Sequence, residues 1–334
     1  MDSPVVNPVS ASRRRPGRWL PGLAIGSAIA AYALIVFGSQ VRVSDSGMGC
    51  PDWPLCSGNL GPVYEFHALM EQTHRYLAGI VTILTFLTAL LAVRARAQRP
   101  RAVRPALFTA AIIVVQIALG AVTVFAGNGA PTVAAHLIAG VAMLGGSTVT
   151  AVCALVPGQS TPGPRLGRIA WVAIGAASVL FVSGSLVVNA GAEKACASFP
   201  LCPSGQSGDL VWPHLLHRSV AGLAGIALLT FSVHAWRRWS ARRGARSLAA
   251  ALATLVLATA TLGIVSALLK APPAWQDLHL AGAAAVLASA IALATLGWLT
   301  AADRPADKTA HGTGVGWSIQ APPVASTSQG QWRR

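Results

Sequence analysis

The sequence predicts an all-α integral membrane protein of eight transmembrane helices, arranged as two four-helix bundles that are parallel repeats of each other. Composition, the spacing of apolar runs and an internal duplication support this fold class. Of 334 residues, 54% are hydrophobic and 10% are charged, whereas soluble domains carry about 25% charged residues. Apolar side chains in such excess are expected to pack against membrane lipid as well as against one another.

Eight apolar runs, each about long enough to cross a bilayer as a helix, follow one another along the chain. They lie at 20–41, 70–93, 105–126, 132–156, 169–189, 214–236, 247–269 and 277–300. This pattern predicts an N-terminal arm (1–19), a first four-helix half (20–156), a linker (157–168), a second half (169–300) and a tail (301–334). The tail is rich in Ala, Pro, Gly, Ser and Thr without an apolar period, which predicts disorder.

The connections between the runs alternate in charge. Most of the 25 Lys and Arg residues lie in the arm, in the second, fourth and sixth connections, and in the tail. The other connections carry only Arg42, Lys194 and Lys270, apart from Arg75 and Arg218 at helix starts. Because cytoplasmic loops are the ones enriched in basic residues, both termini and the linker are predicted to be cytoplasmic. The net charge of +15 is thereby explained by topology, and we expect no nucleic-acid partner.

Two cysteine pairs share the spacing C-x5-C and lie on the face predicted to be extracytoplasmic, where disulfides persist. The pairs are Cys50 with Cys56 and Cys196 with Cys202. Disulfides are the favoured interpretation; free thiols and a metal site are the alternatives, although zinc sites usually show a shorter spacing between cysteines. Cys153 lies within the fourth run and is predicted to be a packing residue.

The two halves of the chain match each other beyond the cysteines. The segment from Gly38-Ser39 to Pro54-Leu55-Cys56 aligns with the segment from Gly184-Ser185 to Pro200-Leu201-Cys202 at a constant offset of 146 residues. His74-Arg75, Leu119-Gly120 and His136-Leu137 recur 143 residues later as His217-Arg218, Leu262-Gly263 and His279-Leu280. Four spans per half give both halves the same orientation, so the duplication predicts a parallel repeat.

Four of the eight histidines hold matched positions. His74 and His136 are 62 residues apart, as are His217 and His279. That interval returns the chain to the same depth after two crossings, so each pair is predicted near the outer membrane face. Two imidazoles facing each other across a four-helix bundle favour a haem site. Helix–helix hydrogen bonding and a copper or zinc ion are the alternatives. Small residues beside the histidines favour haem: Ala78, Gly79, Gly140, Ala221, Gly222 and Gly282.

Charged residues beside the histidines differ between the halves. Arg75 and Arg218 each follow a histidine and are predicted either to bind haem propionates or to extend toward lipid headgroups. One turn before His74 the first half has Glu71, where the second half has His214. An acid at that position favours a catalytic role, in proton transfer or charge stabilisation; a helix-capping residue paired with Arg75 is the alternative. Asp277, two residues before His279, is predicted to be an exposed helix-start residue.

Together these motifs resemble those of the haem A synthase family. The residues that carry the resemblance are Glu71-x-x-His74-Arg75, Cys50-Pro51-x-Trp53-Pro54-Leu55-Cys56, His136, His217-Arg218 and His279, within residues 20–300. The resemblance implies a bacterial membrane oxidoreductase of haem A biosynthesis and cytochrome oxidase assembly. Such an enzyme oxidises the C8 methyl group of haem O to a formyl group by successive hydroxylation.

The resemblance also implies roles for individual residues. His217 and His279 would ligate a resident haem B that passes electrons, while His74 and His136 would flank the substrate haem O beside the catalytic Glu71. The four loop cysteines would form disulfides near the substrate pocket. Expected partners are membrane lipid, haem O, haem O synthase and an electron donor or acceptor, and a homo-oligomer is left open. The alternative functions are a bis-histidine cytochrome b for quinone-linked electron transfer and a haem carrier or assembly factor.

Overall fold

A computed structural model of the chain describes residues 16–61, 63–156, 167–202, 208–238 and 243–301. Within these residues the regular elements are all helices, one short 3-10 helix at Pro16–Arg18 and eight α-helices. The α-helices are α1 (Leu20–Val43), α2 (Phe66–Arg94), α3 (Pro100–Phe125), α4 (Ala130–Leu155), α5 (Arg168–Asn189), α6 (Val211–Arg238), α7 (Arg243–Leu268) and α8 (Pro273–Ala301). Most of the predicted arm, linker and tail lies outside the described residues.

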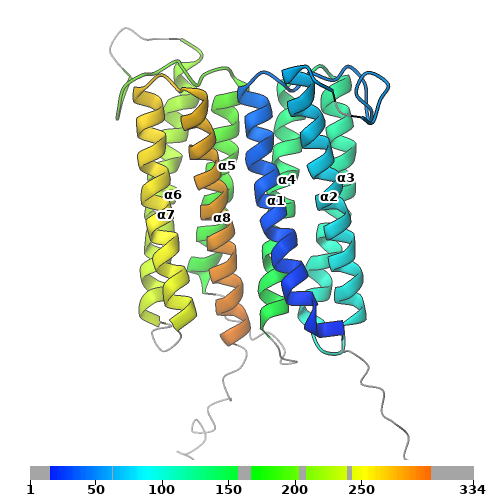
Figure 1. The fold of residues 1–334 in the computed structure, drawn as a ribbon. Coiled ribbons are helices and arrows are strands. Elements are labelled where there is room, and N and C mark those ends of the chain that lie inside the picture. Colours follow the sequence, from blue (N-terminus) through cyan, green and yellow to red (C-terminus); the bar gives the residue numbers. More distant parts are fainter. Residues whose placement is uncertain (1–15, 62, 157–166, 203–207, 239–242, 302–334) are drawn as a thin grey trace, which may run out of the picture. The chain divides into compact units, whose positions relative to one another are not determined.

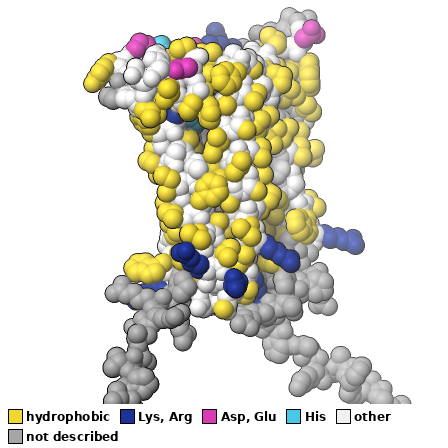
Figure 2. Space-filling view, turned by 90° about the vertical axis from the view of Figure 1, so that its right-hand side faces the viewer, with side chains coloured by type: hydrophobic (Ala, Val, Ile, Leu, Met, Phe, Trp, Pro, Cys, Tyr) yellow, Lys and Arg dark blue, Asp and Glu magenta, His cyan; other side chains and the backbone are white. Residues whose placement is uncertain are grey.

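All eight α-helices are long and apolar enough to cross a membrane. Their outward faces carry large apolar side chains, among them Ile29, Ile83, Leu223 and Ile226, each more than half exposed. Figure 2 shows this apolar surface between one end where Lys and Arg gather and another that carries Asp and Glu. The predicted all-α membrane fold with eight spanning helices is confirmed, and the chain is a multi-pass membrane protein, whereas the parallel repeat stays a prediction. The cytoplasmic position of its termini stays a prediction.

The helices pack as two groups of four (Figure 1). In the first group, α1 and α3 each contact both α2 and α4; in the second, α5 and α7 each contact both α6 and α8. The groups meet where α4 and α8 contact each other, where α1 contacts α8, and where α5 contacts α4. The two cysteine loops join α1 to α2 and α5 to α6.

Local sequence accounts for where several helices begin. Proline occupies the first turn of α1, α3 and α4, a position where its missing N–H is not needed. The Glu65 side chain caps α2 by accepting a hydrogen bond of 2.8 Å from the backbone N–H of Ala68. The residue that caps α2 is therefore Glu65 and not Glu71; of that alternative for Glu71, only the pairing with Arg75 is present.

The hydrophobic interior differs along the two groups. The second group has one large apolar cluster that includes Leu228, Phe231, Leu252 and Leu293, each at most 1% exposed. The first group has smaller clusters, one toward the histidine end that also includes Phe181 and Ala284 of the second group, one toward the opposite end, and one at the first disulfide. Cys153 is a free, buried thiol in the second of these, as predicted for a packing residue.

Asp277 is buried, which corrects the prediction of an exposed helix-start residue. Its side chain is 5% exposed and accepts hydrogen bonds from two donors on α1, Ser39 Oγ at 2.5 Å and Gln40 Nε2. Tyr32, also on α1, donates a hydrogen bond to the backbone carbonyl of Ala281 on α8. The sequence suggested exposure because Asp is common in first turns, but these partners lie more than 230 residues away and are brought together only by the packing of α1 on α8.

We expect Asp277→Ala to lower the thermal midpoint of the detergent-solubilised protein. The substitution leaves the half-buried hydroxyl of Ser39 without its acceptor, at a cost of up to about 1–3 kcal/mol, whereas the exposed Gln40 side chain can donate to water. Asp277→Asn, which keeps acceptor capacity for Ser39, should cost less. A midpoint for Asp277→Ala equal to that of the wild type would show that this contact between the groups contributes no net stability.

Candidate functional site

The four matched histidines lie near the same end of the helices, on α2, α4, α6 and α8. In the second group, the ring centroids of His217 and His279 are 6.3 Å apart and the ring planes are nearly perpendicular, at 88°. Two imidazoles that coordinate one metal from opposite sides would show a similar separation, given metal–nitrogen bonds of about 2 Å. The second pair therefore fits an iron centre held between α6 and α8.

Hydrogen bonds fix the tautomer of both histidines in the second pair. His279 Nδ1 lies 3.0 Å from the carbonyl oxygen of Thr259, so Nδ1 must carry the proton. His217 Nδ1 lies 2.9 Å from Ser183 Oγ, whose own hydrogen is donated to the carbonyl of Leu180. Ser183 therefore accepts from His217 Nδ1. In both rings Nε2 retains its lone pair, as a metal ligand requires.

The first pair is held differently. His74 stacks on Phe37 with centroids 6.4 Å apart and planes inclined by 10°. His136 Nε2 lies 3.4 Å from Gln116 Nε2. The Nδ1 atoms of both His74 and His136 are buried without a hydrogen-bond partner. The first pair thus lacks the Nδ1 hydrogen bonds that orient the rings of the second pair.

Each of the four histidines packs against a glycine of a neighbouring helix. A Cβ added to Gly38 or Gly120 would lie 3.0 or 3.5 Å from Cε1 of His74 or His136, respectively. A Cβ added to Gly184 or Gly263 would lie 3.3 or 2.7 Å from Cε1 of His217 or His279, respectively. These glycines occupy matched positions in the two halves, so the duplication preserves the close approach of backbone to imidazole as well as the imidazole itself.

We expect Gly263→Ala to displace the His279 ring and to lower the amount of haem bound, because the new methyl group would lie 2.7 Å from Cε1 and 3.0 Å from Nδ1. Overpacking of this kind costs about 1–3 kcal/mol. The matched control is Gly120→Ala, whose methyl group would make an ordinary contact of 3.5 Å with His136. Haem absorbance per protein measures the effect. Equal haem content in both variants would contradict the prediction.

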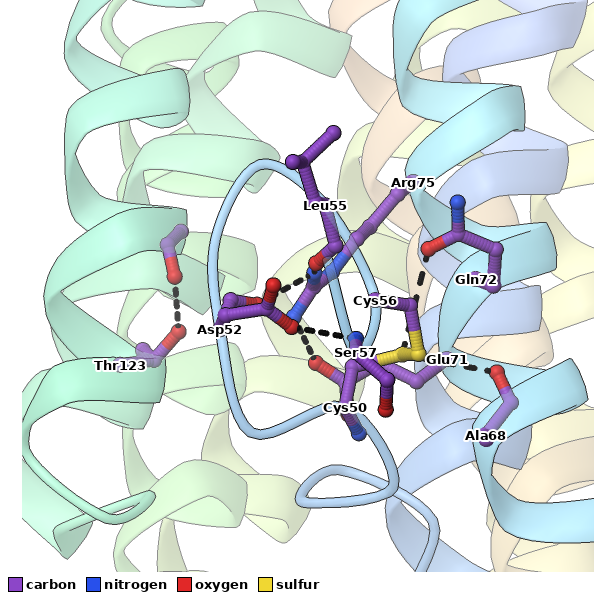
Figure 3. A network of polar contacts seen from close by, with 11 residues as sticks. Cys50, Asp52, Leu55, Cys56, Ser57, Ala68, Glu71, Gln72, Arg75 and Thr123 are labelled. Atoms are coloured by element: carbon purple, nitrogen blue, oxygen red, sulfur yellow. Dashed lines mark hydrogen bonds and ion pairs between the residues drawn. A yellow bond between two sulfur atoms is a disulfide. The ribbon is translucent and has the colours of Figure 1, made fainter. Parts of the chain in front are cut away.

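Glu71 lies buried at the junction of α2 with the first cysteine loop (Figure 3) and is 5% exposed. One carboxylate oxygen accepts from the backbone N–H of Cys50 at 2.8 Å, and the other pairs with Arg75 Nη2 at 2.5 Å. Among the described residues this is the one ion pair between side chains. The Cys50 N–H ties the acid to the first cysteine loop, and the ion pair joins it to Arg75 one turn further along α2.

Both arginines that follow a matched histidine bind a cysteine loop. Arg75 Nη1 donates to the carbonyl oxygens of Asp52, at 2.7 Å, and of Leu55. Arg218 donates to the carbonyl oxygens of Pro200 and Cys196, each at 3.0 Å. Neither contact was among the two predicted alternatives, because backbone carbonyls leave no residue-type signal in the sequence. A role in propionate binding stays a prediction for both arginines.

The cysteine pairs are joined as disulfides within these loops. The S–S distance is 2.04 Å between Cys50 and Cys56 and 2.10 Å between Cys196 and Cys202. In the first loop, the backbone N–H groups of Gly58 and Ser57 hold the pKa of the Asp52 carboxyl below its usual range. The first loop is therefore held by a disulfide, by the Asp52 turn and by the contacts to Glu71 and Arg75.

Sequence reasoning missed four residues that contact the histidines. They form two matched sets, Phe37 with Ser183 at an offset of 146 and Gln116 with Thr259 at an offset of 143. Phe37 and Ser183 directly precede the aligned glycines Gly38 and Gly184, and Gln116 interrupts an otherwise apolar run. Extending the alignment of the two halves by one residue before the glycines would have found Phe37 and Ser183. Comparing the matched positions for differences in side-chain chemistry would have found Gln116 and Thr259.

A mononuclear metal site held by protein ligands alone is not supported. In the part of the chain that the structure describes, no three His, Cys, Asp or Glu side chains are grouped so as to hold a metal ion. His214, which stands in place of Glu71, is 8% exposed, and its Nε2 has no hydrogen-bond partner. A haem needs only two protein ligands, because its macrocycle supplies the others, so a site with a pair of histidines agrees better with haem than with a single metal ion.

The chain is similar to known proteins over much of its length. The model of a family described as cytochrome oxidase assembly protein (COX15-CtaA) matches residues 22–67 and 62–291. A heme A synthase of Bacillus licheniformis is 27% identical over 66% of this chain and 76% of its own length. A heme A synthase of Shouchella clausii is 29% identical over 73% of this chain and 85% of its own length. A protoheme IX farnesyltransferase of Roseiflexus castenholzii is 30% identical over 52% of this chain and 34% of its own length.

Proposed function

Because the chain belongs to the cytochrome oxidase assembly protein family, we propose that it is a haem A synthase, a membrane oxidoreductase that converts haem O to haem A. The reaction oxidises the C8 methyl group of haem O to an alcohol and then to a geminal diol, which loses water to give the formyl group. The product therefore gains one oxygen and loses two hydrogens relative to the substrate. The names of the relatives support this proposal.

The second pair, His217 and His279, would hold the resident haem, which we propose to be haem B. The single observation that carries this assignment is the fixed tautomer of both rings, which leaves each Nε2 free to bind iron. A bound haem B would supply one-electron transfer. The chain's own contribution is to orient the two ligands through Ser183 and the Thr259 carbonyl, and to keep the rings between the glycines of α5 and α7.

The first pair, His74 and His136, would flank the substrate. A substrate haem has to enter and leave, and the missing Nδ1 partners of both rings agree with exchangeable rather than permanent binding. Phe37 and Gln116 would line this site, since they already contact the two rings. The difference in hydrogen bonding between the pairs supports the assignment of the substrate to the first group independently of Glu71.

Glu71 would act on the substrate from the helical turn before His74. As a carboxylate it would stabilise positive charge that develops on the carbon being oxidised, or accept a proton from it. The Cys50 N–H and Arg75 hold the two oxygens in place. The second group has His214 at this position and so lacks the acid, which suits a half that would only transfer electrons.

The experiment that tests the proposal is mass analysis of haems extracted from cells that make haem O, with and without this protein. We expect a new haem that is heavier than haem O by one oxygen and lighter by two hydrogens. Unchanged haem O, from cells in which the protein is expressed and carries haem, would favour the electron-transferring cytochrome. Exchange of unmodified haem with a second protein would favour a haem carrier.

A further inference from the structure

A second buried polar region lies inside the first group, far from the histidines. It is a small cavity lined by two alanines and by six hydroxyl side chains from all four helices. The hydroxyl residues are Ser27 on α1, Thr85 and Thr88 on α2, Thr109 on α3, and Ser147 and Thr150 on α4, and none is more than 4% exposed. Such a concentration of hydroxyls in the core of a membrane protein calls for hydrogen-bond partners, because lipid supplies none.

Three of these hydroxyls have no partner within the protein. Thr109 and Thr150 donate to carbonyls one turn back on their own helices, each at 2.8 Å. The Oγ atoms of Thr85, Thr88 and Ser147 are buried and make no hydrogen bond. All three border the cavity. An unsatisfied buried hydroxyl costs free energy, and three around one space make a set of partners for a bound polar molecule.

The second group lacks these hydroxyls altogether. At the offsets that align the two halves, the positions matched to the six hydroxyl residues hold Ala173, Leu228, Phe231, Leu252, Ala290 and Leu293. All six belong to the large apolar cluster of the second group. The two alanines that line the cavity, Ala24 and Ala106, are matched by Ala170 and Ala249. The same helix positions thus enclose a polar space in one group and a filled apolar core in the other.

We propose that the first group binds water in this cavity, held by the hydroxyls of Thr85, Thr88 and Ser147. The cavity offers about 10 Å³ to the centre of a water-sized molecule, near the least that holds one water. Three donors or acceptors match the usual number of hydrogen bonds for a buried water. Size and chemistry together favour water over any larger polar ligand.

The bound water is separate from the proposed haem sites. Thr85 and Ser147 each follow a matched histidine by 11 residues, which is roughly 16 Å along a helix. An apolar layer that includes Leu34, Val81 and Ile113 fills the interior between them. Apolar side chains therefore separate the cavity from the histidines in the half that handles substrate under the proposed function, so the cavity does not continue to them as a proton path.

Radiolytic labelling of the full-length protein in detergent tests the proposal, because a bound water yields hydroxyl radicals that oxidise adjacent side chains. Met143 is 1% exposed and lies one helical turn before Ser147. We expect Met143 to be oxidised in the wild type, and its oxidation to fall to background in Thr85→Val/Thr88→Val/Ser147→Ala. The control Thr148→Val, which removes a hydroxyl bonded to the Leu144 carbonyl, should leave it unchanged. No oxidation in the wild type, or equal oxidation in the triple variant, would overturn the proposal.

The thermal midpoint of Thr85→Val alone gives a second measurement that does not require the triple variant to fold. If a bound water is hydrogen-bonded to the Thr85 hydroxyl, Thr85→Val removes that hydrogen bond and lowers the thermal midpoint. If the cavity is dry, the same change replaces an unsatisfied hydroxyl with a methyl group and raises the midpoint. A raised midpoint would therefore refute the water site. Neither readout uses enzyme activity, so a failure here is distinguishable from a failure of the proposed function.

Discussion

Glu71→Gln is expected to lower haem A formation by about 10²–10⁴-fold, the range typical of a lost proton-transfer or charge-stabilising group, while haem binding is retained. Glutamine keeps the size of the side chain and an oxygen that accepts from the Cys50 N–H. It removes the negative charge that the proposed chemistry uses. The measurement is the ratio of haem A to haem O in extracts, together with haem absorbance per protein.

A structural role for Glu71 predicts a different order of effects. Arg75 makes the Glu71 ion pair and also two hydrogen bonds to loop carbonyls, so Arg75→Gln should disturb the loop more than Glu71→Gln does. If Glu71 only anchors the loop, Arg75→Gln will be the more damaging substitution. If Glu71 acts on the substrate, Glu71→Gln will be the more damaging for product formation even though it disturbs fewer contacts. Full activity of Glu71→Gln would exclude the catalytic role.

The fold could be predicted from the sequence because its signals are local and repetitive. Apolar runs set the number of helices, and the constant offsets of 143 and 146 residues identify the matched histidines from residue type and position alone. The contacts that orient those histidines were not predictable in the same way. Ser183 accepts from His217 only because its own hydrogen is donated to Leu180, and the Thr259 contact uses a backbone carbonyl. Residue type alone does not report either arrangement.

The errors also have physical causes. Asp277 looked exposed because sequence pattern considers one helix at a time, whereas its burial depends on donors from α1. Propionate binding stays a prediction for Arg75 and Arg218, but the contacts of both side chains with loop carbonyls were not predicted. In each case the missing information was a long-range contact between a side chain and a segment brought near it by helix packing.

His217→Ala is expected to remove the resident haem and, with it, haem A formation. Loss of a residue that merely orients a metal ligand lowers metal affinity by about 10–100-fold, so loss of the ligand itself should lower it further. Ser183→Ala removes the orienting contact alone and should give the smaller effect. Haem per protein, with the reduced-minus-oxidised absorbance spectrum, measures both.

Two comparisons make this test specific to the second pair. His234 lies on the same helix as His217 but is exposed, so His234→Ala should retain haem. His74→Ala should retain the resident haem and lose product, because the proposed substrate pair is separate from the proposed haem B pair. If His217→Ala retained its haem while His74→Ala lost it, the assignment of resident and substrate sites would be reversed, and the fixed tautomers of the second pair would then have to serve substrate binding.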